Sequence, residues 1–489
     1  MSQSVIGLVK TRVEAENLVD ALQNAGFLNS DLSVLFPDKQ GSKDFAHDNS
    51  TKAPEGAATG ATTGGVIGGA LGLLAGIGAL AIPGVGPFIA AGPIMATLSG
   101  VGVGATLGGL TGALIGMGIP EYEAKMFEGK LKEGNILINK SIFFLGENRP
   151  IIDGDKKYEV LSIKASHVVV KGFKIQHSSY ASLDDPGGIK IYESSNVTIE
   201  ENILYDNFFG IYLQYCSKCI VKNNRVISFG KQEQEIGNGI HCWKSDSIQV
   251  IGNKISGNRD GIYFEFVTNS VIWRNISYDN IRYGLHFMFS NNDAYFTNCF
   301  TNNGAGVAVM FSNHITMMNN TFRENWGDAA FGMLLKEISD CYMAGNNFNN
   351  NTSAIFMDGT NRMKIEKNNF VANGWGMKIQ ANCMDNLIEH NNFMGNTFDV
   401  STNGTLTLNE FRENYWDKYE GYDLDKNKIG DIPYHPLSLY AVIVEGNPTA
   451  MLLYRSFMVT LLDKSEKVLP SLTPDNFVDK QPLMHAIKL

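Results

Sequence analysis

The sequence is poor in charge, cysteine and proline. Only 18% of its 489 residues are charged, and 50 acidic against 40 basic side chains give a formal net charge of -10. This acidic balance argues against a nucleic-acid partner. Six cysteines are too few for a disulfide-built scaffold of this length. A hydrophobic fraction of 44% supports packed cores and excludes wholesale disorder.

The first residues also lack the features of a secretory signal. Charged residues recur through residues 1–20 and leave no continuous apolar run between them. A cleaved signal needs such a run after a basic start. We therefore expect no signal peptide at this end of the chain.

Glycine, in contrast, is abundant, and its 51 residues follow two patterns. The first is a charge-free stretch, residues 56–120, in which 20 of 65 residues are glycine. Glycines spaced four apart over 64–76 and over 100–116 predict two helices whose backbones approach closely. The proline-containing segment 82–93 would form the turn between them. Each run is near bilayer length, so this helical hairpin could enter a membrane or form a soluble helix pair or oligomerisation module.

The residues around this hairpin predict a small α/β region over 1–134. The expected elements are a strand, a helix, a strand and a later helix–strand pair, at residues 4–9, 12–25, 32–36 and 121–138. The segments VIGLVKTRVEAE, LFPDK, FAHDNSTKAPEGA and GIGALAIPGVGPFIAAGPIMA resemble a family of small bacterial general-stress proteins over about residues 1–138. That resemblance implies no activity.

The second glycine pattern is a repeat of about 22 residues. A Gly-apolar-x-apolar motif recurs from Gly188 to Gly376, with Ala354 in place of one glycine, and an asparagine follows 14 residues later eight times and 15 once. The asparagines are Asn202, Asn224, Asn253, Asn275, Asn298, Asn320, Asn346, Asn368 and Asn391. Two landmarks held at one offset over nine turns identify a repeat protein.

This period, with short alternating strands, predicts a mainly β fold: a right-handed, single-stranded parallel β-helix of about ten coils over residues 135–411. Leucine-rich repeats have a similar length, but their dense leucine pattern is absent. We expect glycine to supply turn conformations with positive φ. The asparagines would stack into a hydrogen-bonded ladder between coils about 4.8 Å apart.

Strand periodicity then sorts the residues after each leading glycine. The first and third face inward, as in Ile211/Leu213, Ile240/Cys242, Ile262/Phe264 and Leu285/Phe287. The second and fourth face outward, giving Tyr212/Gln214, His241/Trp243, Tyr263/Glu265, His286/Met288, Ala308/Met310 and Leu334/Lys336. An outward stripe of this kind indicates a binding surface. Its candidate contact residues are Tyr212, Trp243, Tyr263 and Glu265.

Saccharide processing is one chemistry that such a face could carry, and it needs two or three clustered acids. The outward columns supply Glu265 and Asp358, which lie four coils and so roughly 19 Å apart. The stripe therefore disfavours glycosidase or lyase activity.

Copper binding is the second chemistry. His286 and Met288 share one strand face, Met310 follows in the next coil, His241 lies two coils back and His314 follows near the end of its strand. Imidazole and thioether groups suit Cu(I). The alternative is an apolar docking patch, because methionine is common on adaptable protein-binding surfaces.

Cysteine gives a weaker signal. Cys216 and Cys219 form a lone CxxC, and Cys219, Cys242 and Cys341 fall on inward positions. Buried core thiols are the expected state. A disulfide between Cys216 and Cys219 is left open.

Residues 412–489 form a capping loop and tail. Asp423, Asp425, Asn427 and Asp431 alternate as in a calcium loop, but Lys428 and Tyr434 replace its usual Gly and Glu, so a Ca²⁺ site and an Asx-rich capping turn both stay open. Residues 449–469 predict an amphipathic helix that caps the solenoid or docks on a partner.

Residues 135–489 resemble the NosD family of β-helical maturation proteins for nitrous oxide reductase. The resemblance rests on GNGIHCWKSD, GNRDGIYFEF, RYGLHFMFSNND, GVAVMFSNH, ENYWDKYEGYDLDKNKIGDIPY and the tail LLYRSFMVTLLD and LTPDNFVDKQPLM. It implies an extracytoplasmic, non-enzymatic protein that helps to deliver copper. The implied partners are an ABC transporter permease and ATPase, a copper chaperone and nitrous oxide reductase.

The N-terminal region departs from that family, whose members carry a signal peptide. A natural fusion and a chimeric gene both account for it, and in a natural fusion residues 56–120 could contact the membrane. The alternatives to copper maturation are a polysaccharide-binding or carbohydrate-active β-helix, and a membrane-associated stress protein that uses the solenoid as an interaction surface.

Overall fold

The computed structural model describes residues 12–28, 32, 34–37, 78–82, 86–91, 135–180, 185–404, 408–468 and 477–489. The chain divides into two compact units, Met1–Ile136 and Leu137–Leu489.

The described part of the first unit holds one helix and a three-stranded antiparallel sheet in the order β1-β3-β2. The elements are α1 (Arg12–Asn24), β1 (Val34–Pro37), β2 (Gly78–Ile82) and β3 (Gly86–Ala91). The helix and first strand match the predicted segments at 12–25 and 32–36. The strand predicted at 4–9 and the helix predicted from residue 121 lie outside the described residues. The strand predicted at the end of 121–138 is present as Ile136–Ile138, but it joins a sheet of the second unit and not the small sheet.

Of the helical hairpin predicted over 56–120, the structure describes only residues 78–82 and 86–91, around the predicted turn at 82–93. Residues 78–82 and 86–91 pair as an antiparallel β-hairpin in which Leu80 faces Phe88. Pro83 and Pro87 disfavour a helix here, because proline lacks the backbone donor and clashes with the preceding turn. The glycine series at 64–76 and 100–116 lie outside the described residues.

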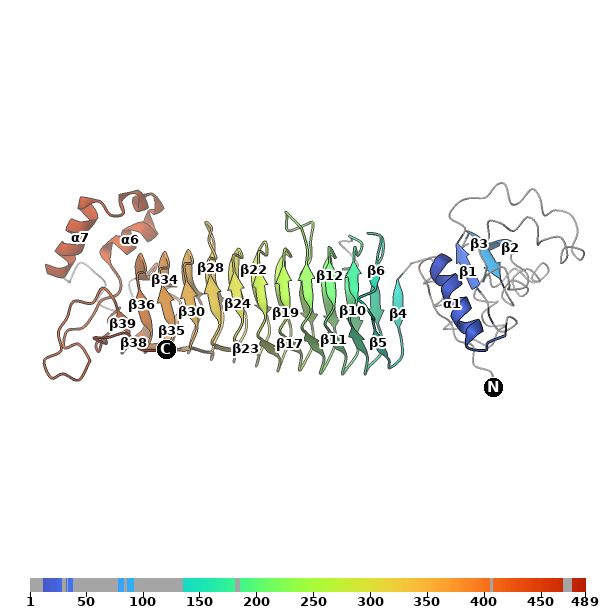
Figure 1. Ribbon diagram of the computed structural model, residues 1–489. Coiled ribbons are helices and arrows are strands. Elements are labelled where there is room, and N and C mark those ends of the chain that lie inside the picture. Colours follow the sequence, from blue (N-terminus) through green and yellow to red (C-terminus); the bar gives the residue numbers. More distant parts are fainter. Residues whose placement is uncertain are drawn as a thin grey trace, which may run out of the picture. The chain divides into compact units, whose positions relative to one another are not determined.

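The second unit is a right-handed parallel β-helix of twelve coils, built from three parallel sheets of twelve strands each (Figure 1). The first sheet contains β4 (Ile136–Ile138), β7 (Leu161–Ile163), β10 (Gly187–Tyr192), β13 (Phe209–Gln214), β16 (Ile240–Trp243), β19 (Asp260–Glu265), β22 (Tyr283–Met288), β25 (Ala305–Met310), β28 (Phe331–Lys336), β31 (Ser353–Asp358), β34 (Trp375–Ile379) and β37 (Phe398–Ser401).

The second sheet contains β5 (Phe143–Leu145), β8 (Val169–Lys171), β11 (Thr198–Glu200), β14 (Ile220–Lys222), β17 (Gln249–Ile251), β20 (Val271–Trp273), β23 (Ala294–Phe296), β26 (Thr316–Met318), β29 (Tyr342–Ala344), β32 (Lys364–Glu366), β35 (Met384–Glu389) and β38 (Leu408–Arg412). The third contains β6 (Ile151–Asp153), β9 (Lys174–Gln176), β12 (Ile203–Tyr205), β15 (Arg225–Ile227), β18 (Lys254–Ser256), β21 (Ile276–Tyr278), β24 (Cys299–Thr301), β27 (Thr321–Arg323), β30 (Asn347–Asn349), β33 (Asn369–Val371), β36 (Asn392–Met394) and β39 (Tyr415–Trp416).

The predicted count of about ten coils is therefore too low. Three coils lack the glycine landmark. Strand register places Val160 at the leading position of the second coil and Asp399 at the leading position of the last coil. The third is the first coil, which lies before Gly188 in the chain. A landmark built on glycine misses coils in which another residue starts the strand.

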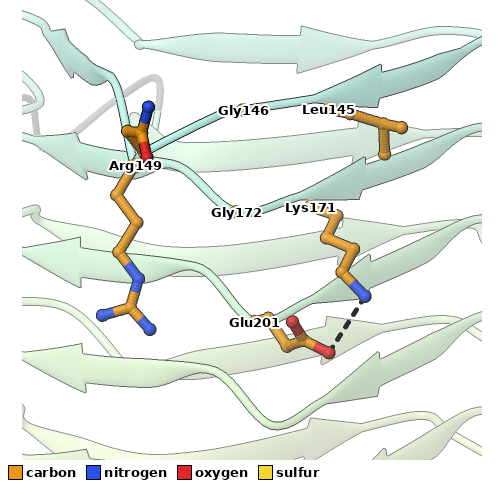
Figure 2. A pocket seen from close by; sticks show the side chains of 7 residues that line it. Leu145, Gly146, Arg149, Lys171, Gly172 and Glu201 are labelled. Atoms are coloured by element: carbon orange, nitrogen blue, oxygen red, sulfur yellow. Dashed lines mark hydrogen bonds and ion pairs between the residues drawn. The ribbon is translucent and has the colours of Figure 1, made fainter.

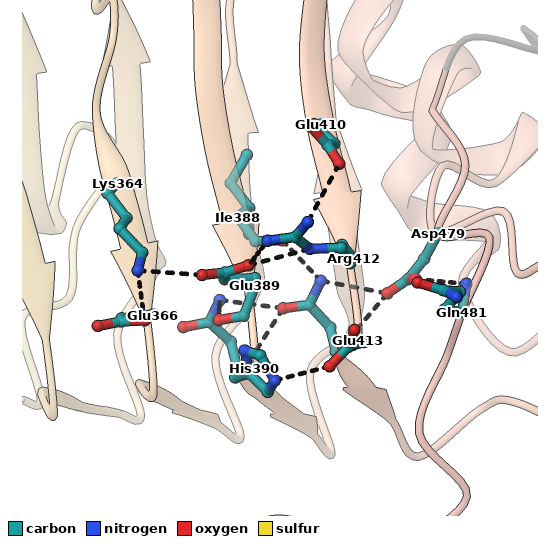
Figure 3. Close-up of polar contacts among 12 residues, drawn as sticks. Lys364, Glu366, Ile388, Glu389, His390, Glu410, Arg412, Glu413, Asp479 and Gln481 are labelled. Carbon is teal, nitrogen blue, oxygen red and sulfur yellow. Dashed lines mark hydrogen bonds and ion pairs between the residues drawn. The ribbon is translucent and has the colours of Figure 1, made fainter. Parts of the chain in front are cut away.

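The asparagine ladder is confirmed. From Asn202 to Asn414, each side-chain Nδ2 donates to Oδ1 of the equivalent asparagine in the next coil at 3.0–3.2 Å. Buried Asp479 ends the ladder by accepting from Nδ2 of Asn414 at 3.1 Å, in the polar cluster of Figure 3. The C-terminal segment thus satisfies the last coil's open donors.

A second ladder was not foreseen. Backbone N–H groups donate to the Oδ1 atom of the next coil's asparagine at 3.0–3.2 Å. Its members are Asn258, Asn280, Asn303, Asn325, Asn351, Asn373 and Asn396. Inside the solenoid, Phe300, Phe322, Phe348, Phe370, Phe393 and Trp416 stack with ring centroids 4.2–5.5 Å apart.

The leading glycines serve another purpose than predicted, because none of them has a positive φ. A Cβ on Gly284 would lie 2.6 Å from the carbonyl oxygen of Gly306. Close approach of successive coils excludes a side chain there. Positive φ occurs instead beside the ladder, as at Asn223, Arg274 and Thr297, just before the ladder asparagines.

The C-terminal segment contains α6 (Leu439–Gly446), the 3-10 helix η2 (Pro448–Leu453) and α7 (Phe457–Val468). The helix predicted over 449–469 is thus broken, with Arg455 at φ 64° between its two parts. Leu452 and Phe457, expected to share an apolar face, are 85% and 81% exposed. Within the described residues, no helix combines the length and apolar character needed to cross a bilayer.

Candidate functional site

The predicted outward stripe is a continuous column of stacked rings on the first sheet. Tyr212 stacks on His241 at 4.6 Å, His241 lies 4.7 Å from Tyr263, and Tyr263 stacks on His286 at 4.5 Å. In-register parallel pairing places these side chains one above another at the strand spacing. The inward partners Ile211, Leu213, Phe264 and Leu285 are fully buried, as predicted.

His286 is held by a buried carboxylate. Its Nδ1 lies 3.4 Å from Oδ2 of Asp260, whose side chain is fully buried. Arg282 donates to both oxygens of Asp260, at 2.9 and 2.6 Å. Burial alone would raise the pKa of Asp260, but the bonds from His286 and Arg282 outweigh it and hold that pKa at about 2.

The other nitrogen of His286 has no partner. Its Nε2 is buried and makes no hydrogen bond within the described residues. A histidine whose Nδ1–H is held by a carboxylate presents the Nε2 lone pair to a ligand, an arrangement common around metal-bound histidines. The Nε2 atom therefore needs a donor or a soft cation that the chain itself does not supply.

Two methionines continue this face. Met288 lies two residues after His286 on β22, and strand register pairs it directly with Met310 on β25. Both are half-buried. Parallel neighbours sit about 4.8 Å apart. The structure thus brings His286, Met288 and Met310 onto one face of adjacent strands, as the sequence predicted.

His241 lies in the same column, two coils earlier. Its Nε2 is 3.7 Å from Oε2 of Glu265, too far for a hydrogen bond, and neither ring nitrogen is hydrogen-bonded within the described part of the chain. Burial lowers the pKa of His241, and the adjacent His241 lowers that of Glu265. At neutral pH this pair is a neutral imidazole beside a carboxylate.

His314 is not part of this face. It lies in the turn between β25 and β26, is exposed, and its Nδ1 is 2.8 Å from Oδ1 of Asn313. Its predicted grouping with His286 is therefore wrong, because the chain has turned the corner between sheets before reaching it.

The predicted contact residues Trp243 and Glu265 lie in the adjacent column of the same sheet, which also contains Met288. Glu265 pairs in register with Trp243 on one side and Met288 on the other. Trp243 is half-buried, and Lys244 lies over its ring at 4.7 Å. Aromatic, acidic and thioether groups thus follow one another along a single outward column.

Sequence reasoning missed Asp260 and Arg282. Asp260 stands one residue before Gly261, in a third outward column that also contains Phe209 and Tyr283. The two-residue strand period counted back from Gly261 assigns Asp260 to the inward side, so the period alone could not have placed it beside His286.

The predicted calcium residues form a network of Asx turns. The Asp423 carboxylate accepts from the backbone N–H groups of Asn427 and Lys428, at 3.1 and 2.8 Å. Asp425 accepts from Asn427, and Asp431 from the backbone of Leu424 at 2.7 Å. This geometry matches the Asx-turn alternative, and calcium binding stays a prediction.

Across the described residues, no group of three or more His, Cys, Asp and Glu side chains is placed to hold a metal. All six cysteines are free thiols, and Cys216, Cys219, Cys242 and Cys341 are buried, as predicted for core positions.

A small concavity of about 390 Å³ lies near the first coils (Figure 2). The ammonium of Lys171 is bonded there to Glu201 at 3.0 Å and to Glu200 at 3.2 Å. The pair is a surface ion bridge between coils and offers no buried donor or acceptor to a ligand.

Residues 227–421 match the family model described as "Periplasmic copper-binding protein (NosD)", and residues 132–236 match that of the "Right handed beta helix region". A Pseudomonas aeruginosa protein named "Probable ABC transporter binding protein NosD" is 26% identical over 370 residues, covering 72% of this chain and 86% of the relative. A Stutzerimonas stutzeri protein of the same name is 25% identical over 372 residues, covering 72% and 84%.

The chain is therefore similar to NosD proteins. Solved structures similar to it include the A-module of the Azotobacter vinelandii mannuronan C-5 epimerase, at 15% identity and TM-score 0.40 over 60% of this chain and 91% of that module. A Streptococcus pneumoniae surface adhesin gives 11% identity and TM-score 0.39 over 61% and 90%.

Proposed function

We propose that this NosD-like chain is a periplasmic accessory protein that handles Cu(I) for assembly of the nitrous oxide reductase metal site. The family description supports copper binding and a periplasmic location, and the relatives' printed name supports association with an ABC transporter. The partners are an ABC transporter permease and ATPase, a copper chaperone and the reductase. The observation that carries the proposal is the buried, unpartnered Nε2 of His286 beside the Met288–Met310 pair.

The donor set fits Cu(I) as cargo. One imidazole and two thioethers are soft, neutral ligands, which favour Cu(I) over the harder divalent ions. Asp260 fixes the orientation of the His286 ring, and Arg282 in turn holds the Asp260 carboxylate in place. The site contains no thiolate, so bound Cu(I) could pass on to a partner with stronger donors.

The ring column supports the partner-docking part of the proposal. Trp243, Tyr263 and Glu265 are half-buried and extend the face away from the methionine pair over neighbouring coils, whereas the predicted contact residue Tyr212 is only 5% exposed. Aromatic side chains contribute large contact areas at small entropic cost. A partner seated on this column would lie directly beside His286.

The test is an anaerobic titration of the full chain with Cu(I) against a chromophoric Cu(I) chelator. We expect one Cu(I) per chain, and at least a tenfold weaker affinity in the His286→Ala, Met288→Ala, Met310→Ala triple variant. His314→Ala is the matched control, because His314 is an exposed histidine off this face. Equal affinities of wild type and triple variant would contradict the ligand assignment.

A carbohydrate-active function is not favoured. Asp260 is bonded to Arg282 and buried, and it lies five residues from Glu265 along β19, which is roughly 16 Å of strand. Glycoside hydrolysis places its two carboxyl groups about 5–9.5 Å apart. Release of sugar or unsaturated uronate from polysaccharide by the purified chain would reverse this preference.

A further inference from the structure

A cavity of about 690 Å³ lies beside the last coil, under the capping loop and the C-terminal helices. Figure 1 shows α6 and α7 at this end of the solenoid. Asp399 and Lys418 line it from the coil and loop, His435 and Tyr434 from the segment before α6, and Tyr454 from the segment before α7. Its volume is within the range of small-molecule sites.

The cavity contains a buried carboxylate that is only half satisfied. Oδ2 of Asp399 receives Lys418 at 3.2 Å and the Tyr434 hydroxyl at 3.4 Å. Asp399 is only 3% exposed, and its buried Oδ1 has no hydrogen-bond partner within the described residues. Burial raises the pKa of Asp399 in spite of Lys418. The positive charge of Lys418 therefore does not fully offset the effect of burying this carboxylate.

The rest of the lining is aromatic and acidic. Three carboxylates, on Asp399, Glu420 and Glu466, face one lysine, and the walls carry five aromatic rings. The rings are those of Phe398, Tyr419, Tyr434, Tyr440 and Tyr454. Nδ1 of His435 is also buried without a hydrogen bond within the described residues. Aromatic faces attract cations, and the surplus of carboxylates repels anions.

We infer that this cavity binds a small organic cation, a protonated amine carried on an apolar body. The ammonium donates to Oδ1 of Asp399, the atom that the chain leaves unpartnered. The apolar body packs against the aromatic walls. Neither the copper site on the first sheet nor the ring column contributes a residue to this cavity, so the inference stands or falls separately from the proposed function.

The experiment uses the full chain and three probes of one shape: benzylamine, benzyl alcohol and benzoate. Saturation-transfer NMR and calorimetry should detect benzylamine binding at millimolar concentration, with the alcohol and the anion at least tenfold weaker. Asp399→Asn should weaken benzylamine roughly tenfold or more, because a charge-assisted bond is lost. Asp417→Asn removes a neighbouring carboxylate that does not line the cavity and should have little effect.

A second variant guards against misfolding at the buried position. Tyr454 is 39% exposed, so Tyr454→Ala should preserve the fold and weaken benzylamine about threefold. Tyr422→Ala, which removes an exposed tyrosine that does not line the cavity, is its control. The inference is overturned if no probe binds, if benzyl alcohol binds as well as benzylamine, or if Asp399→Asn and Tyr454→Ala leave benzylamine affinity unchanged.

Discussion

The asparagine ladder should carry a large share of the solenoid's stability, and Asn346→Ala tests this. The Asn346 amide donates to Oδ1 of Asn368 and to the carbonyls of Met317 and Ala344 at 3.0–3.2 Å. Its Oδ1 accepts from the backbone and side chain of Asn320 at 2.9 and 3.0 Å. Five bonds at about 1 kcal/mol each predict a loss of about 5 kcal/mol in the free energy of unfolding.

Asn347→Ala is the matched control. Asn347 is the next residue, is exposed, and its side-chain oxygen accepts from Asn369 at 2.9 Å. Its loss should cost about 0.5 kcal/mol. Urea unfolding gives the free energies, and hydrogen–deuterium exchange should show lost protection in the coils on both sides of Asn346 only in the first variant. Similar losses in both variants would refute the role of the ladder.

Three further predictions concern single positions. Gly284→Ala should cost about 2 kcal/mol or more, because its Cβ would meet the Gly306 carbonyl at 2.6 Å, whereas Gly446→Ala, with no atom within 4 Å, should be neutral in the same urea assay. The pKa of Asp260 is held at about 2, below its ordinary value, so its contribution to stability is complete above about pH 4 and is lost as pH falls through about 2. Asp260→Asn should therefore flatten the acid limb of a curve of stability against pH. An unchanged acid limb would contradict the assignment. Burial raises the pKa of Asp293 to about 8, so the folded protein keeps a proton on this carboxyl and its stability declines as pH rises from about 4 through 8. Asp293→Asn should therefore raise the melting temperature near pH 8 more than near pH 4. An equal shift at both pH values would contradict the raised pKa.

Much of the fold follows from the sequence, because a solenoid repeats one local rule. The 14-residue offset between glycine and asparagine sets the ladder, and the two-residue strand period separates inward Leu285 from outward His286. The count of coils did not follow, because Val160 and Asp399 replace glycine at the start of a coil. The role of glycine was also misjudged, since only coordinates show that Gly284 faces the Gly306 carbonyl.

The candidate site was predicted in part. Residues on consecutive strands at one register position, such as Met288 and Met310, are neighbours by symmetry of the repeat. His314 was misplaced because the chain leaves the first sheet after Met310, and the length of each strand is not encoded in the period. Asp260 and Asp399 were missed because burial and unpaired oxygens arise from packing between coils and between the solenoid and its cap.

The central claim is that His286, Met288 and Met310 hold Cu(I). Copper K-edge X-ray absorption of the anaerobic full chain loaded with one equivalent of Cu(I) tests it most directly. We predict a three-coordinate environment with one nitrogen and two sulfur neighbours, which is lost in the triple alanine variant and kept in His314→Ala. A shell of oxygen and nitrogen only, or a spectrum that the triple variant leaves unchanged, would contradict the claim.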